Sequence, residues 1–192
     1  MIVILRLGHR IGRDARISTH CGLVARALGA KKIVYTGEKD EQLLGSIKQV
    51  AKNWGGGFSA EYAENYRKII SSYKKKKFLI VHSTMYGIPL QKRIAKIRKS
   101  KNMMFIIGGE KVPSDVYQLA DMNIAIANQQ HSEIAALAIF MHEYFKGKEL
   151  DNTQQAGYNK NTQQAGYNKN KFPKAKLRIV PMERGKRVLK KA

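Results

Sequence analysis

Short apolar runs alternate with longer amphipathic segments over the first 150 residues of the chain. Segments such as 41–54 and 132–145 carry apolar residues at offsets of three and four, which predicts helices that bury one face. The apolar runs have the length of strands and occupy residues 2–7, 33–35, 78–81, 103–107 and 124–127. Buried strands that alternate with helices are typical of an α/β fold, so we predict a mostly parallel sheet flanked by helices.

Two of these runs, 103–107 and 124–127, pass directly into turns that are candidates for a binding site. The turns are GGEKV at residues 108–112 and ANQQHS at residues 127–132. Parallel strands end at the same edge of a sheet, and ligands of α/β proteins usually bind there. We therefore expect the two turns to lie together, after neighbouring strands. The simpler interpretation stays open: the glycines only turn the chain, and residues 128–131 only cap a helix.

The segment after the first strand is unusually basic. It contains His9, Arg10, Arg13 and Arg16, with Asp14 as the one acid. We predict a basic loop here, followed by a helix that Ser18 caps and Gly29 ends. This loop also follows a strand end, so its arginines are further candidates for the site.

The charge of the chain points to a polyanionic partner. Lysine and arginine number 36 against 14 acidic residues, which gives a formal net charge of +22. This excess is more than solubility requires, and nucleic acid is the commonest polyanion that such chains bind. Residues 74–77 are all lysine, and residues 90–101 are predicted to form a basic helix without an acid. A generally basic proteome or an acidic membrane surface is the alternative explanation.

Nothing in the sequence indicates a disulfide, a metal site or a membrane anchor. The single cysteine, Cys21, lies among apolar residues of a predicted helix, where a small buried side chain is expected. The five histidines show no metal-binding spacing, so no metal is expected. The first residues do not resemble a secretory leader, and no run reaches membrane-spanning length. We expect a cytoplasmic protein.

The length of 192 residues suits one domain with a substantial core. The composition changes after residue 150, because the nonapeptide NTQQAGYNK occurs at residues 152–160 and again, identical, at 161–169. The repeat is polar and too short for a solenoid, so a flexible linker or an extended hairpin is expected. We divide the chain into a main domain, this polar linker or hairpin, and a short basic extension, which span residues 1–150, 151–170 and 171–192.

Several collinear motifs resemble those of a known family. From residue 1 to about residue 148 they read MIVILRLGHR, RDARISTH, ARALGA, HSTMYG, GGEKVP, LADMNIAI and NQQHSE. The last turns resemble the second and third motifs of the SPOUT superfamily of S-adenosylmethionine-dependent RNA methyltransferases. The whole set resembles the archaeal tRNA (cytidine-56) 2′-O-methyltransferases. The resemblance implies a deep trefoil knot in the C-terminal part of the sheet, which periodicity alone does not predict.

The resemblance also implies an activity and a set of binding residues. The expected reaction transfers a methyl group from S-adenosylmethionine to the ribose 2′-hydroxyl of cytidine-56 in the T loop of tRNA. Relatives form homodimers, so tRNA is expected to bind across two subunits. The family motifs place the cofactor against backbone groups of the loops, at Ser83, Gly108, Gly109, Glu110, Lys111, Val112, Ile126, Ala127, Asn128, Gln129, Gln130, His131, Ser132 and Glu133.

The catalytic residue is predicted from the chemistry and from the resemblance together. A ribose hydroxyl is a weak nucleophile, so a base or a nearby cation must favour its alkoxide form. In the superfamily an arginine of the first motif has this task, and arginine stays protonated, which favours an electrostatic role. Here Leu23 occupies the usual catalytic position, and Ile134 the place of a third-motif asparagine. We predict Arg16 first and Arg10 second; phosphate binding alone is the alternative for each.

Three other functions stay open on the sequence. The first is a SPOUT 2′-O-methyltransferase of another RNA, such as ribosomal RNA. The second is a basic RNA-binding protein on the same scaffold without catalysis. The departures at Leu23 and Ile134 motivate the second alternative. A dinucleotide-binding enzyme is the third, and the missing GxGxxG after the first strand argues against it.

Overall fold

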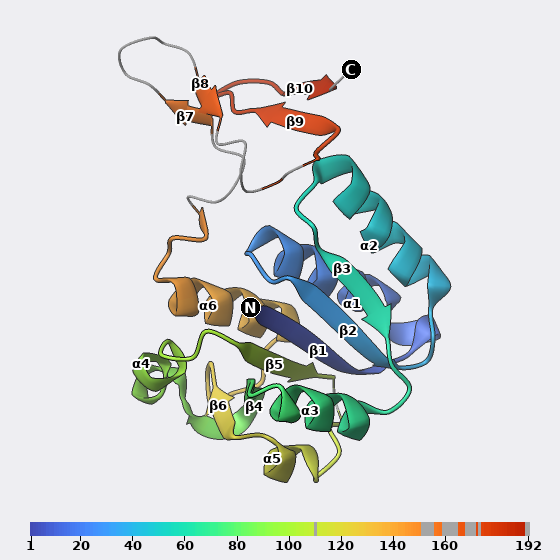
Figure 1. Ribbon diagram of the computed structural model, residues 1–192, viewed down its shortest axis with the longest axis vertical. Coiled ribbons are helices and arrows are strands. Elements are labelled where there is room, and N and C mark those ends of the chain that lie inside the picture. The colour runs from blue at the N-terminus through green and yellow to red at the C-terminus, as the bar shows by residue number, and fades with distance from the viewer. Residues whose placement is uncertain (110, 151–155, 159–164, 168–171, 173, 191–192) are drawn as a thin grey trace.

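The computed structural model describes residues 1–109, 111–150, 156–158, 165–167, 172 and 174–190. Six strands form one sheet in the order β3-β2-β1-β5-β4-β6, and all neighbours in it pair parallel (Figure 1). The strands are β1 (Ile2–His9), β2 (Lys32–Gly37), β3 (Ser59–Tyr62), β4 (Leu79–Pro89), β5 (Met103–Gly108) and β6 (Met122–Ala125). The predicted parallel α/β sheet is confirmed.

Helices cover both faces of the sheet (Figure 1). They are α1 (Ile11–Ala27), α2 (Glu41–Trp54), α3 (Tyr66–Lys75), a 3-10 turn η1 (Leu90–Lys92), α4 (Ile94–Ile97), α5 (Val116–Leu119) and α6 (Glu133–Phe145). The larger core joins α1, α2, α4 and α6 to one face, and the smaller core joins α3 and α5 to the other. Because β1 and β5 lie between two cores, nearly all their side chains are buried, which explains their continuous apolar sequence.

The order of the last strands differs from the prediction in one respect that shapes the site. The two turns were expected after neighbouring strands, but β4 lies between β5 and β6. The prediction is wrong because consecutive strands of a parallel sheet need not be neighbours. The end of β4 therefore lies between the two turns and becomes a third candidate segment.

β4 does not pair evenly with β6. Ser83 and Ile88 both oppose Ile124, so residues 84–87 leave the ladder between two pairings with the same residue. Gly87 returns the chain against β6, and a Cβ at this position would overlap the backbone of Ile124. Glycine thus permits the close approach that lets residues 84–86 project from the sheet edge.

The basic segment after β1 is helical, which corrects the predicted loop and the predicted cap at Ser18. α1 begins at Ile11, and Ser18 lies buried within it, where its hydroxyl pairs with Nδ1 of His9 at 2.8 Å. Asp14 in the first turn favours this earlier start, because a carboxylate stabilises the N-terminus of a helix. The arginines of this segment therefore project from one helix.

The basic helix predicted over residues 90–101 is shorter than expected. It consists of η1 and the single turn of α4, interrupted at Arg93, whose φ and ψ are −123° and −21°. Six cations without an acid repel one another along a helix, and Arg98 instead donates to the backbone oxygen of Glu143 on α6. Contacts to α6 therefore replace regular helix at this end.

The C-terminal part consists of two small antiparallel pairs. Ala156–Tyr158 (β7) pairs with Ala165–Tyr167 (β8), so the described tripeptides of the two repeats form a hairpin ladder. Leu177–Val180 (β9) pairs with Arg187–Lys190 (β10), beyond the end of α2 in Figure 1. The other residues of the repeats lie outside the described part. Among the described helices, none has the length and apolar character needed to span a membrane.

Candidate functional site

A pocket of about 650 Å³ opens at the carboxyl edge of the sheet. Five segments form it: the projecting part of β4, the turn after β5, α5, the loop after β6 with the start of α6, and the start of α1. The lining residues are Arg10, Arg13, Asp14, Ile17, Ser83, Thr84, Met85, Tyr86, Ile107, Gly108, Gly109, Val112, Tyr117, Gln129, Gln130, His131, Glu133 and Ala136. The two predicted turns therefore share one pocket although their strands are not neighbours.

The pocket gathers many of the residues predicted from sequence. Arg10, Ser83, Gly108, Gly109, Val112, Gln129, Gln130, His131 and Glu133 line it. Arg16, Lys111, Ile126, Ala127, Asn128 and Ser132 are not among the lining residues. Glu110 lies outside the described residues. Arg16 is exposed on α1, so its catalytic role stays a prediction.

Two of the predicted residues that do not line the pocket form hydrogen bonds that fix the segments around it. Nδ2 of Asn128 donates to the backbone oxygens of Met85 and Gly87, at 2.7 and 3.1 Å. Oγ of Ser132 accepts from the backbone N–H of Ile134 at 3.1 Å, which confirms Ser132 as the cap of α6. The loop after β6 is therefore tied both to the projecting segment of β4 and to its own helix.

A buried arginine beneath the pocket was missed in the sequence. Arg6 of β1 has no exposed side-chain surface, and its Nη2 lies 3.0 Å from Oε1 of Glu133. Nη1 donates to the backbone oxygen of Leu7, whereas Nε has no partner among the described residues. A Cβ on Gly109 would lie 3.6 Å from Nη1, so the guanidinium supports the glycine turn from below. The signal was present, since Arg6 interrupts an otherwise apolar strand.

The start of α1 supplies cations to the pocket. Nε and Nη2 of Arg10 donate to the carboxylate of Asp14 at 2.9 and 3.4 Å. This hydrogen-bonded guanidinium lowers the pKa of Asp14, which keeps its carboxylate ionised. Arg13 lines the pocket one turn along the helix. Arg10 and Arg13 thus lie at the same mouth as the glycine turn.

A polar network behind β4 fixes the opposite wall. Nδ1 of His82 lies 2.8 Å from Oδ1 of Asn123, and burial lowers the pKa of His82, which favours the neutral ring. The amide of Asn123 donates to the backbone oxygen of Tyr117, whose hydroxyl lies 3.3 Å from Oγ1 of Thr84. Tyr117 and Thr84 line the pocket, so this network connects the β4 edge with α5.

The remaining chemical candidates do not lie in this pocket. His9 is buried between Ser18 and Asp40 and does not line it. Cys21 is buried, and burial raises the pKa of its thiol to about 12, as expected for a structural residue. Within the described ranges, no group of three or more His, Cys, Asp or Glu residues could hold a metal ion.

Comparisons with known proteins point to one family. A family model described as tRNA ribose 2′-O-methyltransferase, aTrm56, matches residues 54–167. Curated tRNA (cytidine(56)-2′-O)-methyltransferases are similar over most of the chain. The protein of Methanosphaera stadtmanae is 46% identical over 82% of this chain and 90% of its own length. The proteins of Thermococcus kodakarensis and Methanocaldococcus jannaschii are 44% and 43% identical, over 98% and 99% of this chain and 97% of each relative.

Solved structures share the fold at low sequence identity. A tRNA modifying enzyme of the TrmH/SpoU type from A. aeolicus has a TM-score of 0.58 and 16% identity, over 78% of this chain and 76% of that one. The SpoU methyltransferase AviRb from Streptomyces viridochromogenes, solved in complex with the cofactor AdoMet, also has a TM-score of 0.58, at 12% identity, over 77% of this chain and 57% of that one. The architecture is thus that of SpoU-type methyltransferases.

The pair between Arg6 and Glu133 yields a test of how the pocket floor is held together. Glu133→Ala leaves the buried guanidinium without its carboxylate, so we expect a loss of about 2–4 kcal/mol in the free energy of unfolding. Glu143→Ala, on the same helix, removes a more exposed partner of Arg98 and should cost below about 1 kcal/mol. Urea unfolding of both variants without added cofactor measures the difference. Equal losses would show that Arg6 does not depend on Glu133.

Proposed function

This chain belongs to the tRNA ribose 2′-O-methyltransferase family, and we propose that the pocket at the carboxyl edge of its sheet is the site of methyl transfer. The reaction moves a methyl group from S-adenosylmethionine to the ribose 2′-hydroxyl of cytidine-56 of tRNA. The observation that carries the proposal is the meeting of residues 83–86 of β4 with the turn after β5 and the loop after β6 around one pocket.

The residues of the pocket suit S-adenosylmethionine, which supplies the electrophilic methyl group when bound. A Cβ at Gly108 would overlap Cγ2 of Val112, so the glycine lets the turn fold tightly onto itself and presents backbone groups to the pocket. Ile107, Val112 and Met85 offer apolar contacts beside the polar groups of Gln129 and Gln130. An adenosyl group with a charged amino-acid tail needs such a mixed lining.

The remaining predicted contacts are part of the same proposal. Lys111, Ile126, Ala127, Asn128 and Ser132 flank the lining residues along the two loops, and backbone or supporting roles fit their positions. Asn128 orients the β4 segment through its two hydrogen bonds. The loops thus contribute through their shape more than through charged side chains.

We assign the electrostatic role at the nucleophile to Arg10 in preference to Arg16. In-line transfer requires the ribose oxygen and the methyl group to be held together, and negative charge develops on that oxygen. Arg10 lines the pocket and is oriented by Asp14, whereas Arg16 lies further along α1, outside the lining. Arg13 provides a second cation at the same mouth. Permanent positive charge at this position stabilises the alkoxide, and the hydroxyl proton passes to solvent water because arginine stays protonated.

We also propose that the protein acts as a homodimer. α1 and α6 pack against each other, yet Ile17 on α1 and Ile139 on α6 are 37% and 45% exposed. Ile17 also lines the pocket, so a second subunit on these helices would reach the site. Sedimentation at micromolar concentration measures the mass directly. A particle of one 21.7 kDa chain would contradict the proposal.

The finer organisation expected from the sequence is proposed on the same basis. Residues 1–150 form the methyltransferase domain, with a trefoil knot at the segments around β4 and β6, where Gly87 crosses closely against Ile124. Residues 151–170 connect it to the extension 171–192. A tRNA-modifying role is consistent with a cytoplasmic location.

Product mapping tests the activity. The protein is incubated with methyl-labelled S-adenosylmethionine and unmodified archaeal tRNA transcript, and the labelled nucleotide is identified after digestion. We expect one 2′-O-methylcytidine at position 56. A cytidine-56 to uridine transcript serves as the control and should lose the label. Label on another nucleotide or on ribosomal RNA would redirect the assignment to another RNA target, and S-adenosylmethionine binding without transfer would favour a non-catalytic role.

Single replacements of the two predicted arginines distinguish their roles. Arg10→Ala should lower kcat at saturating tRNA about a hundredfold, because it removes a charge next to the developing alkoxide. Arg16→Ala should leave kcat within about threefold and act mainly on the KM for tRNA. Steady-state kinetics with both substrates varied measures the split. The reverse pattern would restore Arg16 as the catalytic residue.

A further inference from the structure

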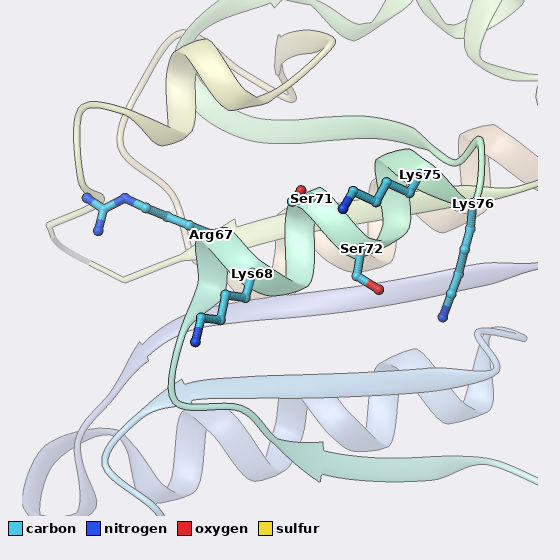
Figure 2. A pocket seen from close by; sticks show the side chains of 6 residues that line it. All are labelled: Arg67, Lys68, Ser71, Ser72, Lys75 and Lys76. Carbon is cyan, nitrogen blue, oxygen red and sulfur yellow. The ribbon is translucent and has the colours of Figure 1, made fainter.

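The outward face of α3 carries a regular arrangement of cations and hydroxyls. Arg67, Ser71 and Lys75 form one row at intervals of four residues, and Lys68, Ser72 and Lys76 form the next (Figure 2). These six residues line an open hollow of about 630 Å³. Because the serine side chains are short, the surface is recessed at the middle of each row, between two long cationic side chains. We call this surface the α3 face.

The α3 face has an excess of positive charge that the described residues do not neutralise. From Tyr66 to Lys77 the sequence contains six cations and no acid. Arg67 pairs with Asp115 at 2.5 Å, and Lys74, outside the hollow, pairs with Asp121 at 3.4 Å. No carboxylate of the described part forms a salt bridge with Lys68 or Lys75. The field over the hollow is therefore positive.

The cations at the two ends of α3 have opposite effects on the helix itself. Lys74 and Lys75 in the last turn favour it, whereas its first turn contains no acid and carries Arg67 and Lys68, which a helix N-terminus disfavours. The N-terminal N–H groups rely instead on Asn65, whose Oδ1 accepts from the backbone of Lys68 at 3.1 Å. Cations at the positive end of the dipole cost stability unless an anion lies over them. Arg67 and Lys68 are thus better explained by an anionic ligand than by the stability of the helix.

The chemistry of the face suits phosphate groups of a nucleic acid. Lysine, arginine and serine side chains are among the groups that donate hydrogen bonds to phosphate oxygens in protein–nucleic acid interfaces. In α3, Ile70 and Tyr73 are buried in the core, and Tyr66 and Ile69 are partly buried against it. Since a membrane-bound helix needs exposed apolar side chains, a lipid surface does not fit this face.

The α3 face is also connected to the methyl-transfer pocket. Asp115 accepts hydrogen bonds from Nε of Arg67 and from the hydroxyl of Tyr66, at 2.5 and 2.8 Å. Asp115 lies between Val112 and Tyr117, which both line the pocket. The first turn of α3 is thus tied to the wall of the pocket. α3 follows β3 and precedes β4, so it runs from the carboxyl edge of the parallel sheet to the opposite edge.

We propose that the α3 face binds the sugar-phosphate backbone of the tRNA and guides it to the pocket. The proposal rests on the methyltransferase function and adds the surface that holds the substrate. The cation pairs at the two ends of the rows contact separate phosphates, and Ser71 and Ser72 donate hydrogen bonds between them. Backbone contacts of this kind set the position of the tRNA without reading its sequence.

The test removes two unpaired charges and compares them with two matched charges elsewhere. Lys68→Gln with Lys75→Gln removes two of the four cations of the α3 face. Lys48→Gln with Lys52→Gln removes two exposed lysines from α2, on the opposite face of the sheet. Glutamine keeps helix propensity and a polar side chain while removing the charge. Lys68→Arg with Lys75→Arg retains the charge. Affinity for unmodified tRNA is measured as a function of salt, together with kcat and the affinity for S-adenosylmethionine.

We expect the α3 double variant to bind tRNA roughly tenfold more weakly near 0.1 M salt and to lose about 1–2 units from the slope of log K against log salt. Its kcat at saturating tRNA and its cofactor affinity should stay at the wild-type values, and the arginine variant should restore tRNA binding. An unchanged slope, or an equal loss in the α2 variant, would overturn the proposal.

The two proposals fail in different ways. If the wild-type protein binds tRNA but transfers no methyl group to cytidine-56, the proposed function fails and the salt dependence still tests the α3 face. If transfer occurs and the α3 double variant binds like wild type, the α3 face is not the tRNA surface and the function stands.

Discussion

The pocket depends on the position of β4 between β5 and β6 and on the close approach of its chain to β6 at Gly87 and Ile124. Because β5 and β6 pair with β4 on its two sides, β4 departs from regular pairing only at the carboxyl edge, where residues 84–86 project. The turns after β5 and β6 then lie on either side of this segment. One strand placement therefore brings three loops around a single cofactor-sized space.

Two sets of buried or partly buried polar contacts keep these loops in place. Arg6 and Glu133 connect the central strand to the start of α6, and Asn128 joins the following loop to the backbone of β4. A buried guanidinium is tolerated only with a partner, so the position of Glu133 is set by the cost of leaving Arg6 unpaired. The same carboxylate contributes to the wall of the pocket. The ion pair between Arg6 and Glu133 thus both stabilises the fold and positions one wall of the pocket.

The charge of the protein is distributed according to the reaction. Arg10 and Arg13 lie at the mouth of the pocket that we propose as the site of methyl transfer, whereas the cations of α3 lie on a separate outer surface. A tRNA is far larger than a pocket of this size, so affinity for its backbone has to come from outside the pocket. If the two sets of charges have the proposed roles, their separation lets tRNA binding and methyl transfer be altered independently.

The strands, most helices, the candidate turns and the family can be predicted from the sequence, because buried strands and amphipathic helices leave local periodic patterns, and collinear motifs carry the resemblance. Three features became evident only in the folded chain: β4 separates β5 from β6, α1 begins at Ile11, and Arg10 lines the pocket while Arg16 does not. The fold also revealed the pairing of Arg6 with Glu133 across 127 residues. Strand order and the partners of buried charges arise from contacts between distant segments, and no local pattern encodes them.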